Sequence, residues 1–236
     1  MRGVLAIWKK EMRIYFVSPV AYVFLAVFLF VSGLFFTLGV TLTGEASLRV
    51  LGGNLAIAQL FILPMLTMAH FAEERRRGTL EMLLTAPITP AAIVTGKWLA
   101  SLSLVALMLA GTGIFPIVLA YYGDPDWGVM FTSYLGLLAV ASAFCAAGSF
   151  ASSLLDDPVA AGLVGIVMLL PAWLVGRAEA VMPEEWASKI QPLGVLPHLE
   201  SFHRGVLDSA DIYYFLAFTM VFLFMTWRSV ESRRWR

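Results

Sequence analysis

Six long apolar stretches decide what this chain can fold into. They cover residues 20–41, 55–71, 92–121, 129–155, 159–175 and 212–227. A helix that crosses the hydrocarbon core of a bilayer needs about 20 mostly apolar residues. The chain is 60% hydrophobic and only 14% charged, whereas about 25% of a soluble domain is charged. The pattern therefore predicts an all-α polytopic membrane protein with six transmembrane helices.

The fifth apolar stretch leaves one alternative open. It contains Pro171, followed by Trp173 and Gly176, where a helix can break and turn back. The alternative is five spans with a re-entrant segment.

The remaining composition narrows the class of protein. A formal net charge of zero gives no electrostatic reason to expect nucleic acid as a partner. The single cysteine, Cys145, excludes an internal disulfide and a cysteine metal cluster. The first apolar stretch is long enough to span and no small-residue cleavage site follows it, so we expect it to remain as a span.

Basic residues predict the orientation. With six spans, the two termini and the second and fourth loops share one side of the membrane, which carries twelve Lys and Arg residues against four on the other side. Short cytoplasmic segments are enriched in Lys and Arg. We therefore expect both termini in the cytoplasm of a bacterial or archaeal cell, with the chain in the inner membrane.

The first residues predict a helix lying along the membrane surface. Its apolar face contains Val4, Leu5, Trp8, Met12, Tyr15 and Phe16, its opposite face contains Arg2, Lys9 and Arg13, and Ile7 and Ile14 fall outside the apolar arc. Ser18-Pro19 ends this helix. The alternative is a basic flank that only sets orientation.

The second loop predicts a short helix of its own. Gly78 breaks the helix of the second span, Thr79 caps a new one, and Pro87 ends it. Leu80, Leu83 and Leu84 share one face of this helix, which suits docking into a groove of a partner protein. In the alternative, Arg75, Arg76 and Arg77 only enforce orientation and the leucines lie on the lipid surface.

Two cap-plus-proline pairs predict where spans begin. Thr89-Pro90 opens the third span and Asp157-Pro158 opens the fifth. For Asp156 and Asp157, a cation or proton site is the less favoured alternative. In the external segment, His198, Glu200 and His203 lack the spacing of a metal site.

The chain lacks the residues that would let it drive transport by itself, either through ATP binding or through an ion gradient. Gly96-Lys97 is not part of a phosphate-binding loop, because residue 91 is alanine and Trp98 follows the lysine. His70 is the one ionisable candidate inside the spans, whereas ion-driven transporters place such groups mid-membrane. We therefore expect no enzymatic activity in this chain and an energy source elsewhere.

Several motifs together resemble the permease subunits of type-2 ABC exporters, most closely the gliding-motility-associated subgroup. The main motif comprises Glu74, Gly78, Thr79, Leu80, Glu81, Leu83, Leu84 and Pro87. Gly96-Lys97, then Ser152-Ser153-Leu154 with Ala160-Ala161, and finally Phe202, Gly205, Val206, Leu207, Asp208, Asp211, Tyr214 and Phe215 extend the resemblance over nearly the whole chain.

The resemblance implies a division of the chain into functional segments. Residues 1–236 would form one transmembrane domain, with a connecting helix in 1–19, spans in 20–71 and 91–175, a coupling-helix loop in 72–90, an external re-entrant segment in 176–211, and the last span and basic tail in 212–236. The connecting helix would use Trp8, Lys9, Lys10 and Arg13. Pro171, Trp173, Gly205, Asp208 and Asp211 would belong to the re-entrant outer region.

The resemblance also implies partners. The coupling helix, with Glu74 and Glu81 as polar contacts, would sit on a cytoplasmic ABC ATP-binding subunit, which would hold ATP and Mg while this chain binds no cofactor directly. A second permease copy or homologue, the lipid bilayer and an auxiliary periplasmic or extracellular protein complete the expected partners. The alternatives are a force-transmitting component of a motility or assembly complex and a self-sufficient secondary transporter or channel.

Overall fold

The computed structural model describes residues 2–43, 48–85, 88–122, 126–180 and 183–232. Over these ranges the chain forms helices and no strand. In chain order they are α1 (Arg2–Val17), α2 (Val20–Thr43), α3 (Leu48–Thr67), α4 (Ala72–Arg76), α5 (Thr79–Thr85), α6 (Pro90–Gly111), α7 (Ile114–Tyr122), α8 (Trp127–Leu154), α9 (Pro158–Val175), η1 (Ala178–Ala180), α10 (Glu184–Ile190), η2 (Gln191–Leu193), α11 (Val195–His203) and α12 (Ser209–Ser232).

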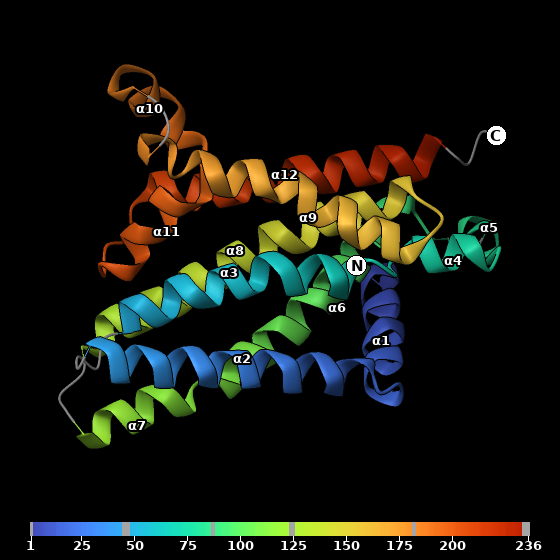
Figure 1. Ribbon diagram of the computed structural model, residues 1–236. Helices are drawn as coiled ribbons and strands as arrows, with labels where there is room; N and C mark the ends of the chain where they lie inside the picture. Colours follow the sequence, from blue (N-terminus) through green and yellow to red (C-terminus); the bar gives the residue numbers. More distant parts are fainter. Residues whose placement is uncertain (1, 44–47, 86–87, 123–125, 181–182, 233–236) are drawn as a thin grey trace.

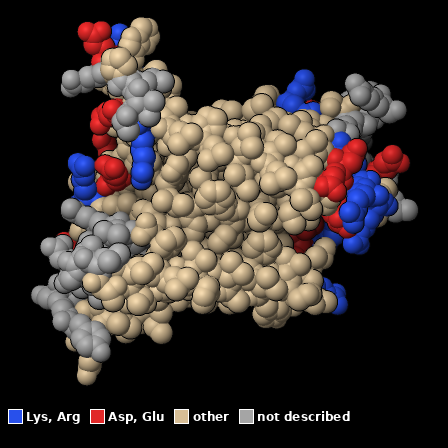
Figure 2. Space-filling model, in the orientation of Figure 1, with Lys and Arg blue, Asp and Glu red and all other residues tan. Residues whose placement is uncertain are grey.

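Six helical stretches among the described residues are long and apolar enough to cross a membrane: α2, α3 with α4, α6 with α7, α8, α9 and α12. The predicted all-α, six-span fold is therefore confirmed. Figure 1 shows α1 lying across one end of these spans, with α4, α5 and the C-terminal end of α12 nearby. The helices α10 and α11 lie at the opposite end. On the face in Figure 2, charged side chains gather at the two ends and leave the middle uncharged.

The helix α8 is at the centre of the packing. It contacts α3, α6, α9, α11 and α12, and its residues from Ala143 to Ser153 are all buried. A Cβ atom added at Gly148 would lie 2.0 Å from the hydroxyl oxygen of Thr67 and 3.2 Å from the Cα of Pro64. Small residues let membrane helices approach closely, and at Gly148 the contact between α3 and α8 leaves no room for a side chain.

The predicted helix starts are confirmed. The side chain of Thr89 caps α6, whose first residue is Pro90, and the side chain of Asp157 caps α9, whose first residue is Pro158. Asp126 caps α8 in the same way, although the sequence analysis did not single it out. Each cap satisfies a backbone N–H group that has no partner inside its helix.

The helix α9 continues through Pro171 and ends at Val175, with Gly176 as its C-cap. The chain therefore does not break at the proline itself but at the far edge of the predicted region. An interior proline is tolerated in a membrane helix because neighbouring helices and local adjustments satisfy the freed carbonyl. Pro171 is exposed and Trp173 is buried, so the two residues lie on different sides of α9.

The outer segment between α9 and α12 folds into short helices. The helix α11 packs back against α3, α8, α9 and α12, whereas α10 projects from the end of the molecule (Figure 1). Gly205 follows α11 with a φ of +83°, a left-handed conformation that glycine adopts without strain. The Asp208 carboxylate then accepts a hydrogen bond from the backbone of Ala210 at 3.0 Å. Placement of this segment as re-entrant in a bilayer stays a prediction.

A histidine–aspartate pair ties this outer segment to the last span. The Nδ1 of His198 lies 2.6 Å from a carboxylate oxygen of Asp211, and its Nε2 lies 2.8 Å from the carbonyl oxygen of Pro192. Tyr214 stacks on the imidazole ring. Within the described ranges, no three His, Cys, Asp or Glu side chains gather to hold a metal ion. The contacts of His198 fasten the turn before α11 to the first turn of α12.

Candidate functional site

The segment that carries the strongest motif folds as two short helices set at an angle. We call residues 72–85, comprising α4, Arg77, Gly78 and α5, the elbow. Gly78 has a φ of +68°, so it ends α4 as predicted. Thr79 is the first residue of α5, and its hydroxyl donates to the carbonyl oxygen of Glu74 at 3.1 Å. The Thr79 hydroxyl thus serves a carbonyl at the end of α4 that lacks an intrahelical donor, and its predicted role as the cap of α5 stays a prediction.

Four charged residues join the elbow to α1 and α6, and we call them the lysine–glutamate cluster: Lys10, Glu11, Glu74 and Lys97. The Lys97 ammonium lies 2.9 Å from Glu11 and 3.0 Å from Glu74. The Lys10 ammonium lies 3.0 Å from the same oxygen of Glu74 and 3.5 Å from Glu11. The side chains of Lys97, Glu11 and Glu74 are only 2%, 9% and 16% exposed. Lys10 is 44% exposed, so two positive and two negative charges balance each other in a cluster that is buried except on its Lys10 side.

This cluster changes the interpretation of Glu74 and Lys10. Glu74 was expected to contact a partner subunit, but it faces the interior of its own chain. Burial lowers the pKa of Lys10, but the hydrogen bond and charge of Glu74, with those of Glu11, more than offset that effect, so the pKa is raised. The sequence analysis missed Glu11, whose signal was a lone acid on the same helical face as Ile7 and Tyr15.

A second set of contacts fastens the elbow to the turn between α8 and α9. The Arg75 guanidinium donates to the carbonyl oxygens of Ser153, Leu154 and Leu155 at 3.1, 3.3 and 3.2 Å, and it pairs with the Asp156 carboxylate. The last carbonyls of a helix lack intrahelical donors, and a cation at this end is also favoured by the helix dipole. Arg75 therefore has a structural role beyond setting orientation.

A serine of α8 completes this attachment. The Ser152 hydroxyl accepts hydrogen bonds from the backbone N–H groups of Phe71 and Ala72 at 3.0 and 3.1 Å. The same hydroxyl donates to the carbonyl oxygen of Met68 at 2.6 Å. It satisfies backbone groups at the junction of α3 and α4, where the helical ladder is interrupted. Both ends of α4 are thus held by α8.

His70 links three helices just before the elbow. Its Nδ1 lies 2.9 Å from the Ser149 hydroxyl and its Nε2 lies 3.0 Å from the Tyr15 hydroxyl. The Ser149 hydroxyl uses its proton on the carbonyl oxygen of Cys145, so it accepts from Nδ1–H and leaves Nε2 to accept from Tyr15. Burial, reinforced by the charge of Glu11, raises the pKa of Tyr15, which keeps this donor protonated. His70 is thus a structural link between α1, α3 and α8.

The apolar face of α5 is partly covered by its own chain. Leu80 is buried in a small core with Ile7, Phe71, Ile93 and Val94. Leu83 is half-buried against the same core. Both residues were expected to enter a partner's groove, and for Leu80 this is wrong because its side chain already packs inside the protein.

The remaining motif residues divide between solvent and the undescribed part of the chain. Glu81 is exposed. The side chain of Leu84 and the whole of Pro87 lie outside the described residues. Of the polar contacts expected on the elbow, Glu81 is therefore the one that faces outward.

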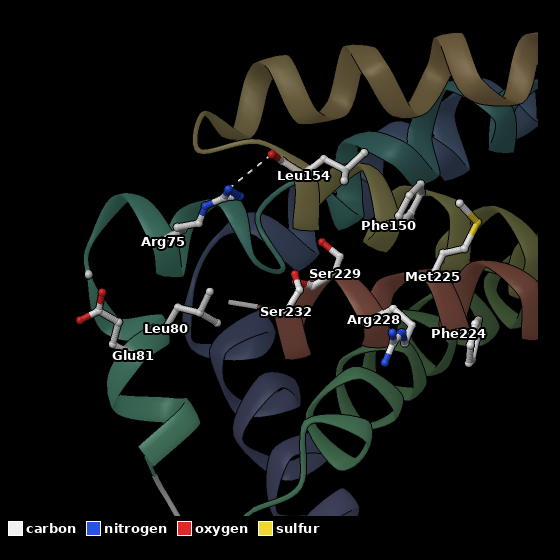
Figure 3. Close-up of a pocket in the computed structure, with 11 residues that line it drawn as sticks. Arg75, Leu80, Glu81, Phe150, Leu154, Phe224, Met225, Arg228, Ser229 and Ser232 are labelled. Carbon is white, nitrogen blue, oxygen red and sulfur yellow. Dashed lines mark hydrogen bonds between the residues drawn. The ribbon is translucent and has the colours of Figure 1, made fainter. Parts of the chain in front are cut away.

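A pocket of about 880 Å³ opens between the elbow and the C-terminal half of α12. Figure 3 shows Arg75, Leu80 and Glu81 of the elbow on one side and Arg228, Ser229 and Ser232 of α12 on another. Phe150 and Leu154 of α8 also line it. The pocket offers an apolar floor with charged groups of both signs at its edge.

The helix α1 packs along α6 with a face that includes one residue from outside the predicted apolar arc. Ile7, expected outside the apolar arc, is buried, and a Cβ at Gly96 would lie 2.7 Å from it. Leu5 and Phe16 of the predicted apolar face are exposed on the protein surface, where a helix lying along a membrane would meet lipid. Glu11 lies on the same side of α1 as Ile7, and its pairing with Lys97 holds this side against α6.

The four residues expected in a connecting helix have different surroundings. Trp8 is half-buried, and its indole N–H donates to the Ser103 hydroxyl at 3.0 Å. Lys10 belongs to the lysine–glutamate cluster, whereas Lys9 and Arg13 are exposed. The helix therefore presents both an anchored face and a cationic outer face.

Six apolar spans, a transverse amphipathic helix and an elbow fastened to the bundle define a multi-pass membrane subunit of the permease class. The family model of the ABC-2 family transporter proteins matches residues 5–221, and the chain therefore belongs to this family. Inner membrane transport permease YhhJ of Escherichia coli (strain K12) is 33% identical over 108 residues, which cover 45% of this chain and 28% of that protein. The protein of the same name from Shigella flexneri matches equally. The match thus spans little more than a quarter of the length of these relatives, and assignment to the motility-associated subgroup stays a prediction.

Proposed function

We propose that this protein is the permease subunit of an ATP-driven exporter, in which a separate cytoplasmic ATP-binding subunit holds ATP and Mg²⁺. The observation that carries this proposal is the elbow. It lies at one end of the spans (Figure 1), and its residues Glu74 and Arg75 bind α1, α6 and the α8–α9 turn. Because the elbow is attached to several helices, a displacement of the elbow by a partner outside the membrane would be transmitted to those helices.

The proposed mechanism is a mechanical one. Closure of the ATP-binding subunits displaces α5, and the motion passes through Gly78 into α4. Because Glu74 and Arg75 connect α4 to other helices, α4 moves together with the ends of α1, α6 and α8. Two permeases, either identical or homologous, form the pathway, and ATP acts by favouring one of their arrangements.

The elbow end faces the cytoplasm in this proposal. The support is the excess of Lys and Arg predicted for that side. The native Cys145 is buried, so labelling by a maleimide reports the accessibility of an introduced cysteine. In right-side-out inner-membrane vesicles, an impermeant maleimide should label Ser188→Cys on α10 and leave Ser232→Cys on α12 unlabelled until the vesicles are opened. The reverse pattern would invert the orientation.

The interaction with the ATP-binding subunit is tested on the exposed face of α5. Glu81→Lys reverses a charge on the elbow, and Glu185→Lys reverses an exposed charge on α10 at the opposite end. Each variant is co-expressed with an ABC ATP-binding subunit that co-purifies with the wild-type chain. We expect Glu81→Lys to lower both the amount of ATP-binding subunit that co-purifies and the ATPase rate, and Glu185→Lys to leave both unchanged. Equal results for the two variants would contradict docking on the elbow.

Glu81 is a better probe than the leucines of the same helix. An aspartate at Leu80 would place a charge in a buried apolar core, which destabilises the fold itself. A loss of complex would then have two explanations. Glu81 contacts solvent, so its replacement tests the partner alone.

A further inference from the structure

A cavity of about 550 Å³ lies between α1, the start of α2, the end of α3 and α4. One part of its wall is apolar and comes from Ile14, Val20, Phe24 and Met65. The other part is polar and includes Lys10 with the rest of the lysine–glutamate cluster. The cavity therefore has one apolar and one charged end.

A second hollow of about 640 Å³ adjoins the first. It is lined by Lys10, Arg13, Ile14, Val17 and Ser18, and it shares Lys10, Ile14 and Ser18 with the first cavity. We call the two together the α1 pocket. Its outer part has an aliphatic floor from Ile14 and Val17 and a rim of two cations from Lys10 and Arg13.

The charges of the α1 pocket favour an anionic occupant. Counting every charged residue that lines it, the cations are Lys10, Arg13, Arg77 and Lys97 and the anions are Glu11, Glu73 and Glu74, which leaves one positive charge in excess. Lys97 and Arg77 are paired with carboxylates. Within the described part of the chain, Arg13 pairs with no carboxylate. Arg13 is therefore the cation available to an anion from outside.

The position of the pocket identifies the kind of anion. The helix α1 lies across the ends of the spans (Figure 1), so the pocket sits where α2 enters the membrane. Val17 and Val20, which flank Ser18-Pro19, are 79% and 43% exposed. At this depth an exposed apolar floor meets acyl chains, while basic residues just above it meet lipid headgroups.

We propose that the α1 pocket binds an anionic phospholipid of the leaflet on the elbow side. Its phosphate lies against Arg13 and Lys10, and its acyl chains cover Ile14, Val17, Val20 and Phe24. Because Lys10 also holds Glu74, the bound lipid fastens α1 beside the elbow. The site does not depend on ATP or on a partner subunit, so it is tested separately from the proposed transport function.

The test compares two charge-removing variants of the same helix. Arg13→Gln removes a cation that lines the pocket, and Lys9→Gln removes an exposed cation of α1 that does not line it. The purified full-length protein is exchanged into micelles that contain phosphatidylglycerol or phosphatidylcholine, and bound lipid is counted by native mass spectrometry. We expect preference for phosphatidylglycerol, and a loss of about fivefold in its binding for Arg13→Gln, the effect of one basic residue at an anionic surface. Lys9→Gln should change binding by less than about twofold.

A third variant tests the apolar part without changing charge. Ser18→Trp places a bulky side chain where both parts of the pocket meet, and we expect it to lower the binding of phosphatidylglycerol while thermal unfolding stays cooperative. Equal losses for Arg13→Gln and Lys9→Gln would overturn the proposal in favour of diffuse attraction between α1 and the membrane. Displacement of the lipid by millimolar inorganic phosphate would also overturn it, because the site would then recognise phosphate alone.

Discussion

Replacing Lys97 with methionine tests what the lysine–glutamate cluster contributes to the fold. The substitution keeps an unbranched side chain that is one atom shorter, and it removes a charge that contacts Glu11 at 2.9 Å and Glu74 at 3.0 Å. At an effective dielectric constant of about 20, each contact at this distance corresponds to about 5.5 kcal/mol before desolvation is counted. Removing one partner of a buried ion pair costs about 3–5 kcal/mol net.

The structure favours the lower end of that range. Lys10 remains beside Glu74 at 3.0 Å and neutralises part of the charge that Lys97→Met exposes. We therefore expect the free energy of unfolding to fall by about 3 kcal/mol. The assay is reversible unfolding in mixed micelles, followed by tryptophan fluorescence. Lys9→Met, at an exposed site on α1, is the matched control and should change stability by less than about 0.5 kcal/mol.

A double variant separates charge balance from packing. Glu11→Gln with Lys97→Met leaves one lysine and one glutamate, Lys10 and Glu74, so the cluster is neutral again. The double variant should therefore be more stable than the sum of the single losses predicts, with a coupling of about 1–3 kcal/mol. If Lys97→Met costs no more than Lys9→Met, or if the two losses simply add, the cluster is not the ionic link described above.

Three further changes test the local geometry. Gly78→Ala should lower the free energy of unfolding by about 1–2 kcal/mol, because a residue with a Cβ is strained at a left-handed φ. The added Cβ itself would meet no atom within 4 Å, so the effect comes from the backbone. It is measured as a lower Tm, and an unchanged Tm would contradict the left-handed turn. Asp157→Ala should cost about 1 kcal/mol in the same assay through loss of the α9 cap, whereas Asp157→Asn should retain most of it. Tyr15 has a raised pKa in the folded protein, caused by burial and then by Glu11, so its contribution is intact below about pH 10 and is lost as the pH rises further. Between about pH 10 and 11, the free energy of unfolding should therefore fall less for Tyr15→Phe than for the wild type. Parallel curves of unfolding free energy against pH for the two proteins would refute this.

The sequence predicted those parts of the fold that depend on local patterns. The six spans follow from apolar length, and the starts of α6 and α9 follow from Thr89-Pro90 and Asp157-Pro158. Gly78 likewise marked the turn of the elbow. In each case the signal and its structural consequence lie within a few residues of one another.

The lysine–glutamate cluster could not be predicted in this way. Glu11, Glu74 and Lys97 are far apart in the sequence, and each alone is typical of a solvent-facing position. Their burial becomes favourable only when all are present, because an unpaired buried charge is strongly unfavourable. The same pairing places Ile7, which lies outside the predicted apolar arc of α1, in a buried position against α6.

The burial of Leu80 shows a second limit of prediction from the sequence. Amphipathic spacing identified the apolar side of α5 but not what covers it, and a core from α1, α6 and α12 does so in part. The spacing of apolar residues shows which face of a helix is buried. Which protein segment covers that face depends on the tertiary fold.

The two sides of the elbow can diverge independently during evolution. Glu74, Arg75 and Leu80 are constrained by residues of this same chain, so a change at any of them requires a compensating change elsewhere in the gene. Glu81 is exposed, so under the proposed docking it is constrained by the partner subunit rather than by this chain. If the ATP-binding subunit docks on α5 as proposed, an engineer who wishes to exchange that subunit should redesign the outward face of α5 and leave the inward residues as they are.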